Sequence, residues 1–559
     1  MKKIPAALSC SALLCLWSAL GWAQTAEELL ASGKNTENVT NFGMGYDLKM
    51  YSPLKQIDKS NVRRLVPAWS FSLANDMGEH SQPTVYNGVM YVVNGNWTFA
   101  IDIATGRQIW RTPVQYERAA LRVGNAGAIM RGPATIYNGK LFRQTVDAHL
   151  LALDMKTGKE LWKTKFAEYK EGYLGVVAPM IVNGVLISGM AGGDRTTRGF
   201  LDGYDPETGK RLWRTYTVPA PGEKGSETWP NRELPDAWKY GGAATWQVGS
   251  YDPQLDLYFI GTGNAEPYNP AYRKSMDSLY CASILAIRPK TGEMVWYYQT
   301  VPNDSFDFDA NAESLIADLR VDGRPRKVLI TAHKNGFLYV IDRTDGKPIA
   351  ANPFVKVNWA KHIDLKTGRP VLTDLLERAM EGETVNVFPS RGTNASLIAF
   401  NPKTGLVYLN SWNYPRLMKY VDFKFELGKG STGIESTMAT PKGEPAGYHM
   451  AIEPLTGKVV WQVPLMDMPS SAGMLATDGG LLFTGLLTGE VVALDQDSGK
   501  RLWQFKTGSS IVGPPITYTH KGRQYVTVLS GLGGSVPNRV AAGSVPPGGS
   551  VWTFALMPE

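Results

Sequence analysis

The most regular feature of the chain is a short run of alternating hydrophobic and polar residues, followed by a turn and a second short run. In LALDMKTGKELW, at positions 151–162, the alternation has a period of two, which is the period of a β-strand with one buried face. An acidic residue or Asn opens the turn and Gly closes it, because Gly accepts the positive φ that tight turns require. The pattern predicts repeated strand–turn–strand units.

Eight copies of this unit occur, at 99–110, 151–162, 202–213, 285–296, 339–350, 398–409, 450–461 and 492–503. Six of them end in Trp, whereas Ala350 and Leu409 stand at that position in the other two. A large flat side chain at a fixed repeat position suits packing between successive sheets. Short strands in repeats of roughly 40–50 residues are typical of β-propellers.

We therefore predict an all-β fold: an eight-bladed β-propeller with four-stranded antiparallel blades and Trp residues docked between them. An open solenoid is the alternative. In a closed ring, a strand near Leu65–Phe71 must share a sheet with the C-terminal strand Val551–Leu556. Insertions in repeat proteins collect on the binding face. Because the longest spacing between repeats lies between Gly209 and Gly292, we expect function to concentrate around residues 220–280.

The N-terminus has the features of an export signal. Lys2 and Lys3 precede a largely apolar stretch from Ile4 to Leu20, and Gly21 and Ala23 are small residues suited to a cleavage site. This pattern predicts a signal peptide at 1–23, a single propeller domain at 24–559 and a periplasmic location. A retained membrane anchor is the alternative for the same stretch. No later segment is apolar enough for a membrane span, so we expect none in the mature chain.

Net charge and cysteine content limit the kinds of ligand and covalent link that the chain is expected to have. The net charge is +7, and +5 without Lys2 and Lys3. There is no run of five basic residues, which speaks against nucleic-acid binding. Cys281 is the one cysteine outside the signal, so we expect no intrachain disulfide. No Cys-x-x-Cys-His occurs, so covalent haem is not expected.

Between the repeats lie four phrases: GGAATW (241–246), GTGN (261–264), DFDANAE (307–313) and KNGFLYVIDR (334–343). With the repeats, they resemble the pyrroloquinoline quinone (PQQ)-dependent alcohol dehydrogenases of the methanol and ethanol type, in the form without haem. The resemblance runs from about residue 40 to the C-terminus. It implies oxidation of a small-molecule alcohol, a PQQ cofactor and a soluble cytochrome c or similar acceptor. A homodimer is possible.

The resemblance also implies a catalytic pair and a metal site. Asp307 matches the catalytic base, and Lys334 matches the cation that contacts the quinone oxygens. Four oxygen-donor residues match the metal site: Asp194, Asn264, Asp307 and Asp309. Oxygen donors suit Ca²⁺ or, as the alternative, a lanthanide. In an extended loop, residues two apart point to the same side, so Asp309 is expected to face the ion together with Asp307.

Other residues match cofactor contacts. Trp246 matches the aromatic floor under the PQQ ring, and polar contacts fall on Arg131, Thr145 and Asn394. His80 stands beside the cofactor where a Glu is usual, and Asp194 also replaces a Glu. Taken alone, each of these residues also fits an ordinary structural role. Some positions depart from the family: Asn125 and Ala126 replace a vicinal cysteine pair, and Ser471 and Ala395 replace aromatics near the substrate.

The smaller residues at 395 and 471 predict an alcohol larger than methanol, such as a polyol or a sugar-like compound. Two other functions remain open at this point. One is a non-catalytic periplasmic propeller that scaffolds protein assembly. The other is a propeller hydrolase or lyase that uses a metal without PQQ. A scaffold has no chemical need for acids, an amide and a lysine gathered at one place, so their arrangement in space discriminates between these functions.

Overall fold

The computed structural model describes residues 24–77, 80–123, 135–394, 396–426, 428, 432–438, 443–533, 540–541 and 543–558. One range and four single residues considered above therefore fall outside the described residues: the predicted signal peptide 1–23, Asn125, Ala126, Arg131 and Ala395.

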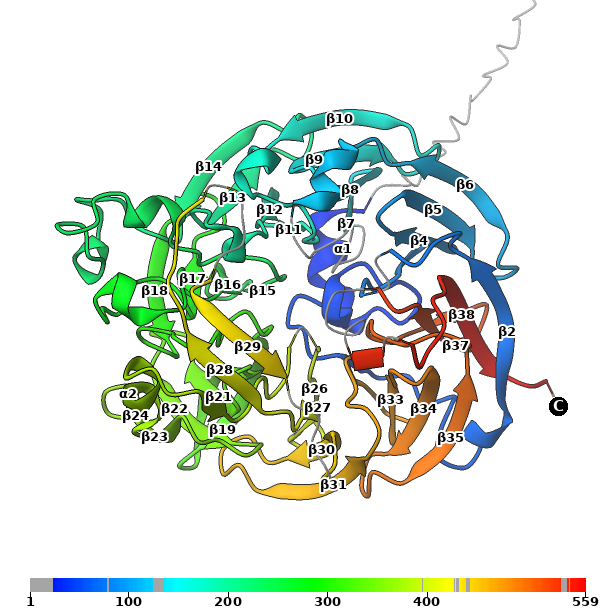
Figure 1. The fold of residues 1–559 in the computed structure, drawn as a ribbon. Coiled ribbons are helices and arrows are strands. Elements are labelled where there is room, and N and C mark those ends of the chain that lie inside the picture. The colour runs from blue at the N-terminus through cyan, green and yellow to red at the C-terminus, as the bar shows by residue number, and fades with distance from the viewer. Residues whose placement is uncertain are drawn as a thin grey trace, which may run out of the picture.

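The described chain is built almost entirely of strands, with two short α-helices, α1 (Ala26–Leu30) and α2 (Leu375–Met380). The strands form separate antiparallel sheets that follow one another around a ring (Figure 1). Among the described residues, no helix is both long enough and apolar enough to cross a membrane. The fold class is all-β, as predicted.

Eight sheets of at least four strands occur among the described residues. The first four are β3 (Thr84–Tyr86), β4 (Val89–Val93), β5 (Trp97–Asp102), β6 (Gln108–Pro113); β7 (Thr135–Tyr137), β8 (Lys140–Thr145), β9 (His149–Asp154), β10 (Glu160–Lys165); β11 (Met180–Val182), β12 (Val185–Ser188), β13 (Phe200–Tyr204), β14 (Arg211–Tyr216); and β15 (Ser250–Asp252), β16 (Leu257–Gly261), β17 (Ser283–Ile287), β18 (Met294–Gln299).

The other four are β19 (Leu315–Val321), β20 (Arg324–Ala332), β21 (Phe337–Asp342), β22 (Pro348–Pro353); β26 (Ala399–Asn401), β27 (Leu406–Trp412), β30 (Gly447–Ile452), β31 (Val459–Leu465); β32 (Leu475–Thr477), β33 (Leu481–Gly485), β34 (Glu490–Asp495), β35 (Arg501–Lys506); and β36 (Ile516–His520), β37 (Arg523–Ser530), β38 (Ser550–Leu556), β2 (Leu65–Ser72). A short strand, β1 (Tyr51–Ser52), adds to β32 in parallel.

Two small sheets are inserted between these. One is the pair β23 (Ala360–Asp364) and β24 (Arg369–Leu372), and the other contains β25 (Val385–Val387), β28 (Arg416–Tyr420) and β29 (Ile434–Met438). Strands β28 and β29 lie on the viewer's side of the ring in Figure 1. This inserted sheet brings residues from the sixth sheet's long connection to the face of the ring.

The two ends of the chain close the ring. Strand β2 pairs in antiparallel register with β38, with Leu65 opposite Leu556 and Phe71 opposite Val551. The predicted pairing of these segments is confirmed. A shared sheet removes the two free edges that an open array would leave, and it ties the N-terminal strand to the last one.

One step of the repeat analysis was wrong. The copy at 398–409 forms β26 and β27, which belong to the same sheet as the next copy, in β30 and β31. It is the first hairpin of that sheet, whereas the other copies supply the third and fourth strands. Leu409 therefore lies in the second strand of its sheet, whereas the Trp residues of the other copies lie in fourth strands. The sheet that closes the ring contains none of the eight copies, and Trp69 on β2 stands there in the fourth strand.

The Trp residues of the outer strands lie against glycines of the following sheet. A Cβ added to Gly158 would lie 2.6 Å from Cε3 of Trp110, and one added to Gly209 would lie 2.5 Å from Cε3 of Trp162. The indole N–H of Trp110 donates to the carbonyl of Met155 at 3.0 Å. Only glycine permits so close an approach, because any side chain there would displace the ring.

Candidate active site

The loop that follows β18 carries Asp307 and is fastened by its own neighbour. The carboxylate of Asp304 accepts the backbone N–H groups of Phe306 at 3.1 Å and Phe308 at 2.8 Å. Between these two anchors, Asp307 has a φ of 64°, a left-handed conformation that costs a non-glycine residue about 1–3 kcal/mol. The backbone is thus not extended at Asp307, in contrast to the prediction. The two hydrogen bonds to Asp304 offset this strain and fix the direction of the Asp307 carboxylate.

Asp307 and Asp309 nevertheless face the same group, the ammonium of Lys334. Lys334 Nζ lies 2.5 Å from Asp307 Oδ1 and 2.8 Å from Asp309 Oδ2. The lysine follows β20, in the turn before β21, and all three side chains are largely buried. The three residues that DFDANAE and KNGFLYVIDR contribute are therefore brought together.

A residue that sequence reasoning missed completes this group. Arg416, the first residue of β28, places Nη2 2.8 Å from Asp307 Oδ2 and donates from Nη1 to the carbonyl of Phe306 at 3.2 Å. Burial favours the neutral form of Asp307, but Lys334 and Arg416 outweigh this and hold its pKa at about 2. Asp307 is therefore an ionised carboxylate at neutral pH. No sequence motif identifies Arg416 as part of the site, because it lies 109 residues from Asp307 along the chain.

Asn264 lies directly beside these acids. It follows β16, and its backbone N–H donates to Asp309 Oδ1 at 3.0 Å. A Cβ on the preceding Gly263 would lie 3.0 Å from the same oxygen, so the glycine of GTGN permits this close approach. Asp194 reaches the group from the turn Gly193–Arg195, between β12 and β13.

The side-chain amide of Asn264 lies between two carboxylates. With its nitrogen turned inward, it donates to Asp194 Oδ1 at 3.3 Å and to Asp309 Oδ1 at 3.1 Å. In the opposite orientation its oxygen faces both acids, an arrangement of three acceptors that a cation can bridge. Tyr268 supports the group by donating its hydroxyl to Asp194 Oδ1 at 3.0 Å.

Asp194 combines two features that are rarely found together. Its side chain is exposed to solvent. Its pKa is nevertheless raised, first because nearby protein atoms reduce the solvation of the carboxylate, and second because Asp307 and Asp309 are negatively charged. Asp194 therefore faces solvent on one side and the buried charges of Asp307 and Asp309 on the other.

Glu266 is the second residue that sequence reasoning missed. It is 1% exposed, and its Oε1 accepts a hydrogen bond from Asn264 Nδ2 at 3.4 Å. Burial and the charges of Asp194 and Asp307 raise its pKa well above the usual range. Its Oε2 has no hydrogen-bond partner among the described residues. The signal was present in the sequence, because Glu266 follows GTGN by two positions.

These residues fit a hard cation. Within the described ranges, no three His, Cys, Asp or Glu side chains lie close enough to hold a metal ion by themselves, since the Lys334 ammonium stands between Asp307 and Asp309. The amide of Asn264 supplies the remaining oxygen. The cluster holds four acids, Asp194, Glu266, Asp307 and Asp309, against the cations Lys334 and Arg416. Buried acids in excess of cations favour a bound ion with two or three charges.

The predicted cofactor residues lie on segments adjoining the cluster. The carbonyl of Ala244 accepts the N–H of Gly263 at 2.9 Å, which places the segment of half-buried Trp246 beside Asn264. Gly392 donates its N–H to the carbonyl of Lys334 at 2.8 Å, and half-buried Asn394 follows two residues later.

The remaining two cofactor residues are placed as follows. Thr145 is buried at the end of β8 and donates its hydroxyl to Asp147. The next residue, Val146, accepts from Gly175, and Leu174 pairs with Ala191 near Asp194. His80 is half-buried, four residues before β3. Its contact with a cofactor remains a prediction.

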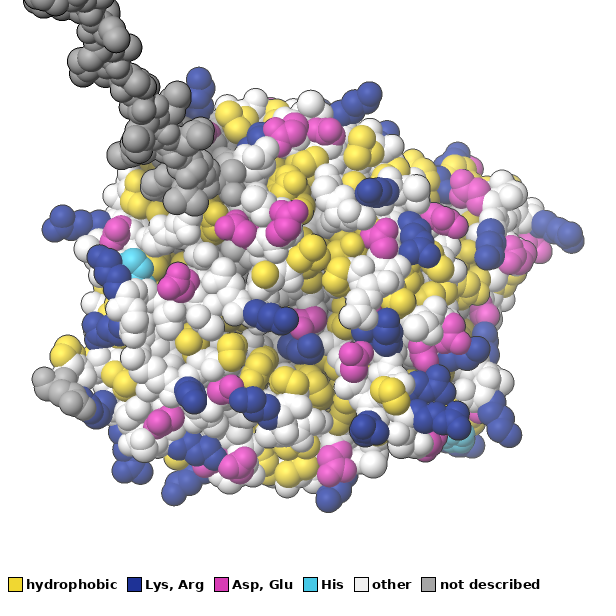
Figure 2. Space-filling view, turned by 180° about the vertical axis from the view of Figure 1, so that it is seen from behind, with side chains coloured by type: hydrophobic (Ala, Val, Ile, Leu, Met, Phe, Trp, Pro, Cys, Tyr) yellow, Lys and Arg dark blue, Asp and Glu magenta, His cyan; other side chains and the backbone are white. Residues whose placement is uncertain are grey.

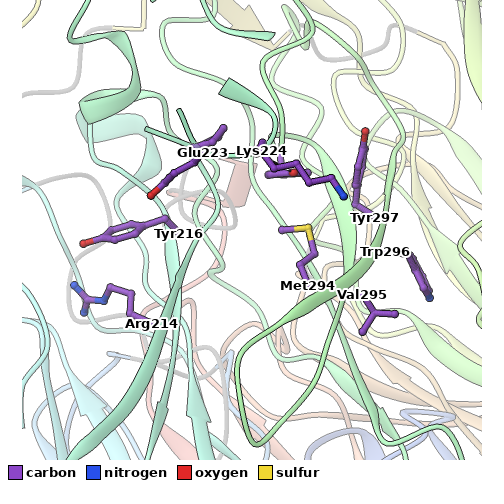
Figure 3. Close-up of a pocket in the computed structure, with 10 residues that line it drawn as sticks. Arg214, Tyr216, Glu223, Lys224, Met294, Val295, Trp296 and Tyr297 are labelled. Atoms are coloured by element: carbon purple, nitrogen blue, oxygen red, sulfur yellow. Dashed lines mark hydrogen bonds between the residues drawn. The ribbon is translucent and has the colours of Figure 1, made fainter. Parts of the chain in front are cut away.

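A separate cavity of about 290 Å³ opens between β14 and β18. Figure 3 shows Tyr216 and Glu223 on one side, with Met294 and Tyr297 on the other. Its lining includes none of the predicted site residues. Figure 2 shows basic and acidic side chains interspersed over the face seen from behind. Neither feature gathers chemistry comparable to that around Asp307.

A family model described as "Glucose/ethanol/alcohol dehydrogenase, beta-propeller domain" matches residues 40–358. A second model, described as "Outer membrane protein assembly factor BamB", matches residues 448–554. The first covers the candidate site as far as Lys334. The second covers only repeats of the last three sheets.

The chain is 39% identical to a quinohemoprotein alcohol dehydrogenase, ADH IIB, of Pseudomonas putida, over 88% of this chain and 73% of that protein. It is 36% identical to the quinoprotein alcohol dehydrogenase PedH of the same species, over 96% of this chain and 93% of that one. Among solved structures, a europium-containing methanol dehydrogenase superposes with a TM-score of 0.88 at 34% identity, covering 95% of this chain and all of the other.

Proposed function

The chain belongs to the family of PQQ-dependent (quinoprotein) alcohol dehydrogenases, and we propose that it oxidises its alcohol at the Asp307 cluster with PQQ and a bound hard cation. The observation that carries this proposal is the gathering of an ionised Asp307, the Lys334 ammonium and the oxygen donors of Asn264 and Asp194 from separate sheets. Ca²⁺ and a lanthanide are the two ions that suit such donors.

Each residue has a proposed part. Asp307 and Lys334 are the catalytic pair. Asp194, Asn264, Asp307 and Asp309 hold the cation. The proposed cofactor contacts are Trp246, Arg131, Thr145, Asn394, Lys334 and His80. The europium in the name of the methanol dehydrogenase of similar structure, together with the two acids of DFD, supports a lanthanide as an alternative to Ca²⁺.

When bound, PQQ would supply the acceptor for the electrons of the alcohol, and a cation held beside it would make it more electrophilic. Asp307 takes the hydroxyl proton of the substrate, since its carboxylate is ionised and held by two cations. Such a base contributes roughly 10²- to 10⁴-fold to the rate. Arg416 is paired with Asp307 independently of Lys334, so it would keep the carboxylate directed into the site if Lys334 contacted a bound PQQ.

We also propose the finer features of the enzyme. The substrate is an alcohol larger than methanol, which the small side chains at 395 and 471 would accommodate. Residues 1–23 direct the chain to the periplasm, and residues 24–559 form one catalytic domain. A separate cytochrome c-type protein receives the electrons. The eight large sheets are the blades of the propeller, with Trp residues docked between neighbours.

The test is reconstitution of the purified chain with PQQ and either Ca²⁺ or a light lanthanide. A series of alcohols from methanol to polyols is assayed with an artificial dye as electron acceptor. We expect cofactor uptake, dye reduction and faster turnover of the larger alcohols. Absence of cofactor uptake and of dye reduction with every ion would refute the proposal and favour the protein-assembly scaffold.

A further inference from the structure

Glu266 lies inside the candidate metal cluster, yet the proposed reaction assigns it no part. Its backbone is fixed, because its N–H donates to the carbonyl of Gly241 at 3.0 Å. Its side chain is 1% exposed and meets Asn264 Nδ2 through Oε1. A buried carboxylate oxygen without a partner is costly, and Oε2 has none among the described residues. Such a group is expected to act on something else in the cluster.

The contact with Asn264 has a direct consequence for the cation. An amide has one oxygen and one nitrogen, so a nitrogen held by Glu266 on one side leaves the oxygen on the other. That other side faces Asp194 Oδ1 and Asp309 Oδ1 at 3.3 and 3.1 Å. In the alternative orientation the amide donates its NH₂ to those two carboxylates and offers no oxygen to an ion, so the hydrogen bond to Glu266 is the contact that would favour the ligating orientation.

We infer that Glu266 is a positioning residue of the cation site, which holds the Asn264 amide oxygen toward the ion and, as a carboxylate beside the bound ion, favours trivalent over divalent ions. This inference rests on the proposed function, since it concerns the ion that the reaction needs. Residues that orient metal ligands in this way typically change metal affinity by roughly 10- to 100-fold when they are replaced. Attraction between Glu266 and the ion grows with the charge of the ion.

The test measures ion binding rather than turnover. The full chain, freed of metal by chelation, is titrated by calorimetry with CaCl₂ and, separately, with EuCl₃. Glu266→Gln keeps an oxygen that can accept from Asn264 but removes the charge. We expect it to weaken Ca²⁺ binding by about 10-fold and Eu³⁺ binding by a further factor of about 10. Glu266→Met, which also lacks the acceptor, should bind both ions more weakly than Glu266→Gln.

Asp252→Asn is the matched control. Asp252 is also a buried acid, but it is paired with Arg343, the residue after β21, at 2.6 Å, so its loss should leave the Ca²⁺ to Eu³⁺ affinity ratio unchanged. Equal weakening of both ions in Glu266→Gln, or no weakening, would overturn the inference while wild-type binding and turnover leave the proposed function standing. Failure of the wild-type chain to bind either ion would overturn both.

Discussion

Replacement of Gly158 by Ala tests how the sheets are joined. Gly158 has a φ of 71°, and an added Cβ would lie 2.6 Å from Trp110 Cε3 and would also clash with Thr112. The left-handed conformation alone costs Ala about 1–2 kcal/mol. Displacing a packed ring adds about 1–3 kcal/mol, and the hydrogen bond from Trp110 to Met155 contributes about 1 kcal/mol more if it breaks.

Gly139→Ala separates these contributions. Gly139 has a φ of 72°, and an added Cβ would meet nothing within 4 Å. Both variants carry the cost of placing Ala in a left-handed conformation, but only Gly158→Ala displaces the indole of Trp110. We therefore expect Gly158→Ala to be less stable than Gly139→Ala by about 2–4 kcal/mol, as the sum of the ring displacement and the lost bond.

The assay is scanning calorimetry of both variants at one scan rate. Scaling by chain length from smaller domains, 1 kcal/mol corresponds to roughly 1 °C of Tm for a chain of this size that unfolds as one unit. The expected difference in Tm is then about 2–4 °C. Equal Tm values for the two variants would refute the docking of Trp110 on Gly158 as a source of stability.

The other predictions concern the cluster. Asp307→Asn should keep PQQ bound but lower dye-linked turnover by about 10²- to 10⁴-fold; undiminished turnover would remove Asp307 from the role of base. Arg416→Gln should raise the pKa of Asp307, which Arg416 holds at about 2 together with Lys334. Because only the ionised carboxylate accepts a proton, the acid limb of the kcat/KM profile should move to higher pH, and an unmoved limb would contradict this. Asp309→Ala should reduce lanthanide-supported activity more than Ca²⁺-supported activity, and an equal loss with both ions would count against a lanthanide-specific part for Asp309.

The fold was predictable because its signal is local and repeated. Period-two alternation and a turn glycine identify a hairpin within a dozen residues, and the closing pair of β2 and β38 followed from the need to end a ring without free edges. The assignment of one copy to each sheet failed at 398–409. A hairpin between the first and second strands has the same local pattern as one between the third and fourth, so sequence alone could not separate them.

The residues of the candidate site were predictable mainly where they lie in one of the four short sequence motifs between the repeats. Asp307, Lys334 and Asn264 lie in the phrases on which the resemblance rested, and the structure brings them together. Arg416 lies in no such phrase, and Glu266 lies just outside one, two positions after GTGN. Arg416 arrives on an inserted sheet, more than a hundred residues from Asp307, and the importance of Glu266 follows from its burial and its contact with Asn264. The roles proposed for Arg416 and Glu266 therefore follow from where the fold places them and not from a local sequence pattern.

The most direct test of the account is a crystal structure of the chain with PQQ and a lanthanide, in which anomalous scattering locates the ion. The account predicts a single strong peak about 2.3–2.6 Å from oxygens of Asp194, Asn264, Asp307 and Asp309, with the PQQ ring on Trp246. An ion bound elsewhere, or PQQ bound away from the Asp307 cluster, would contradict it.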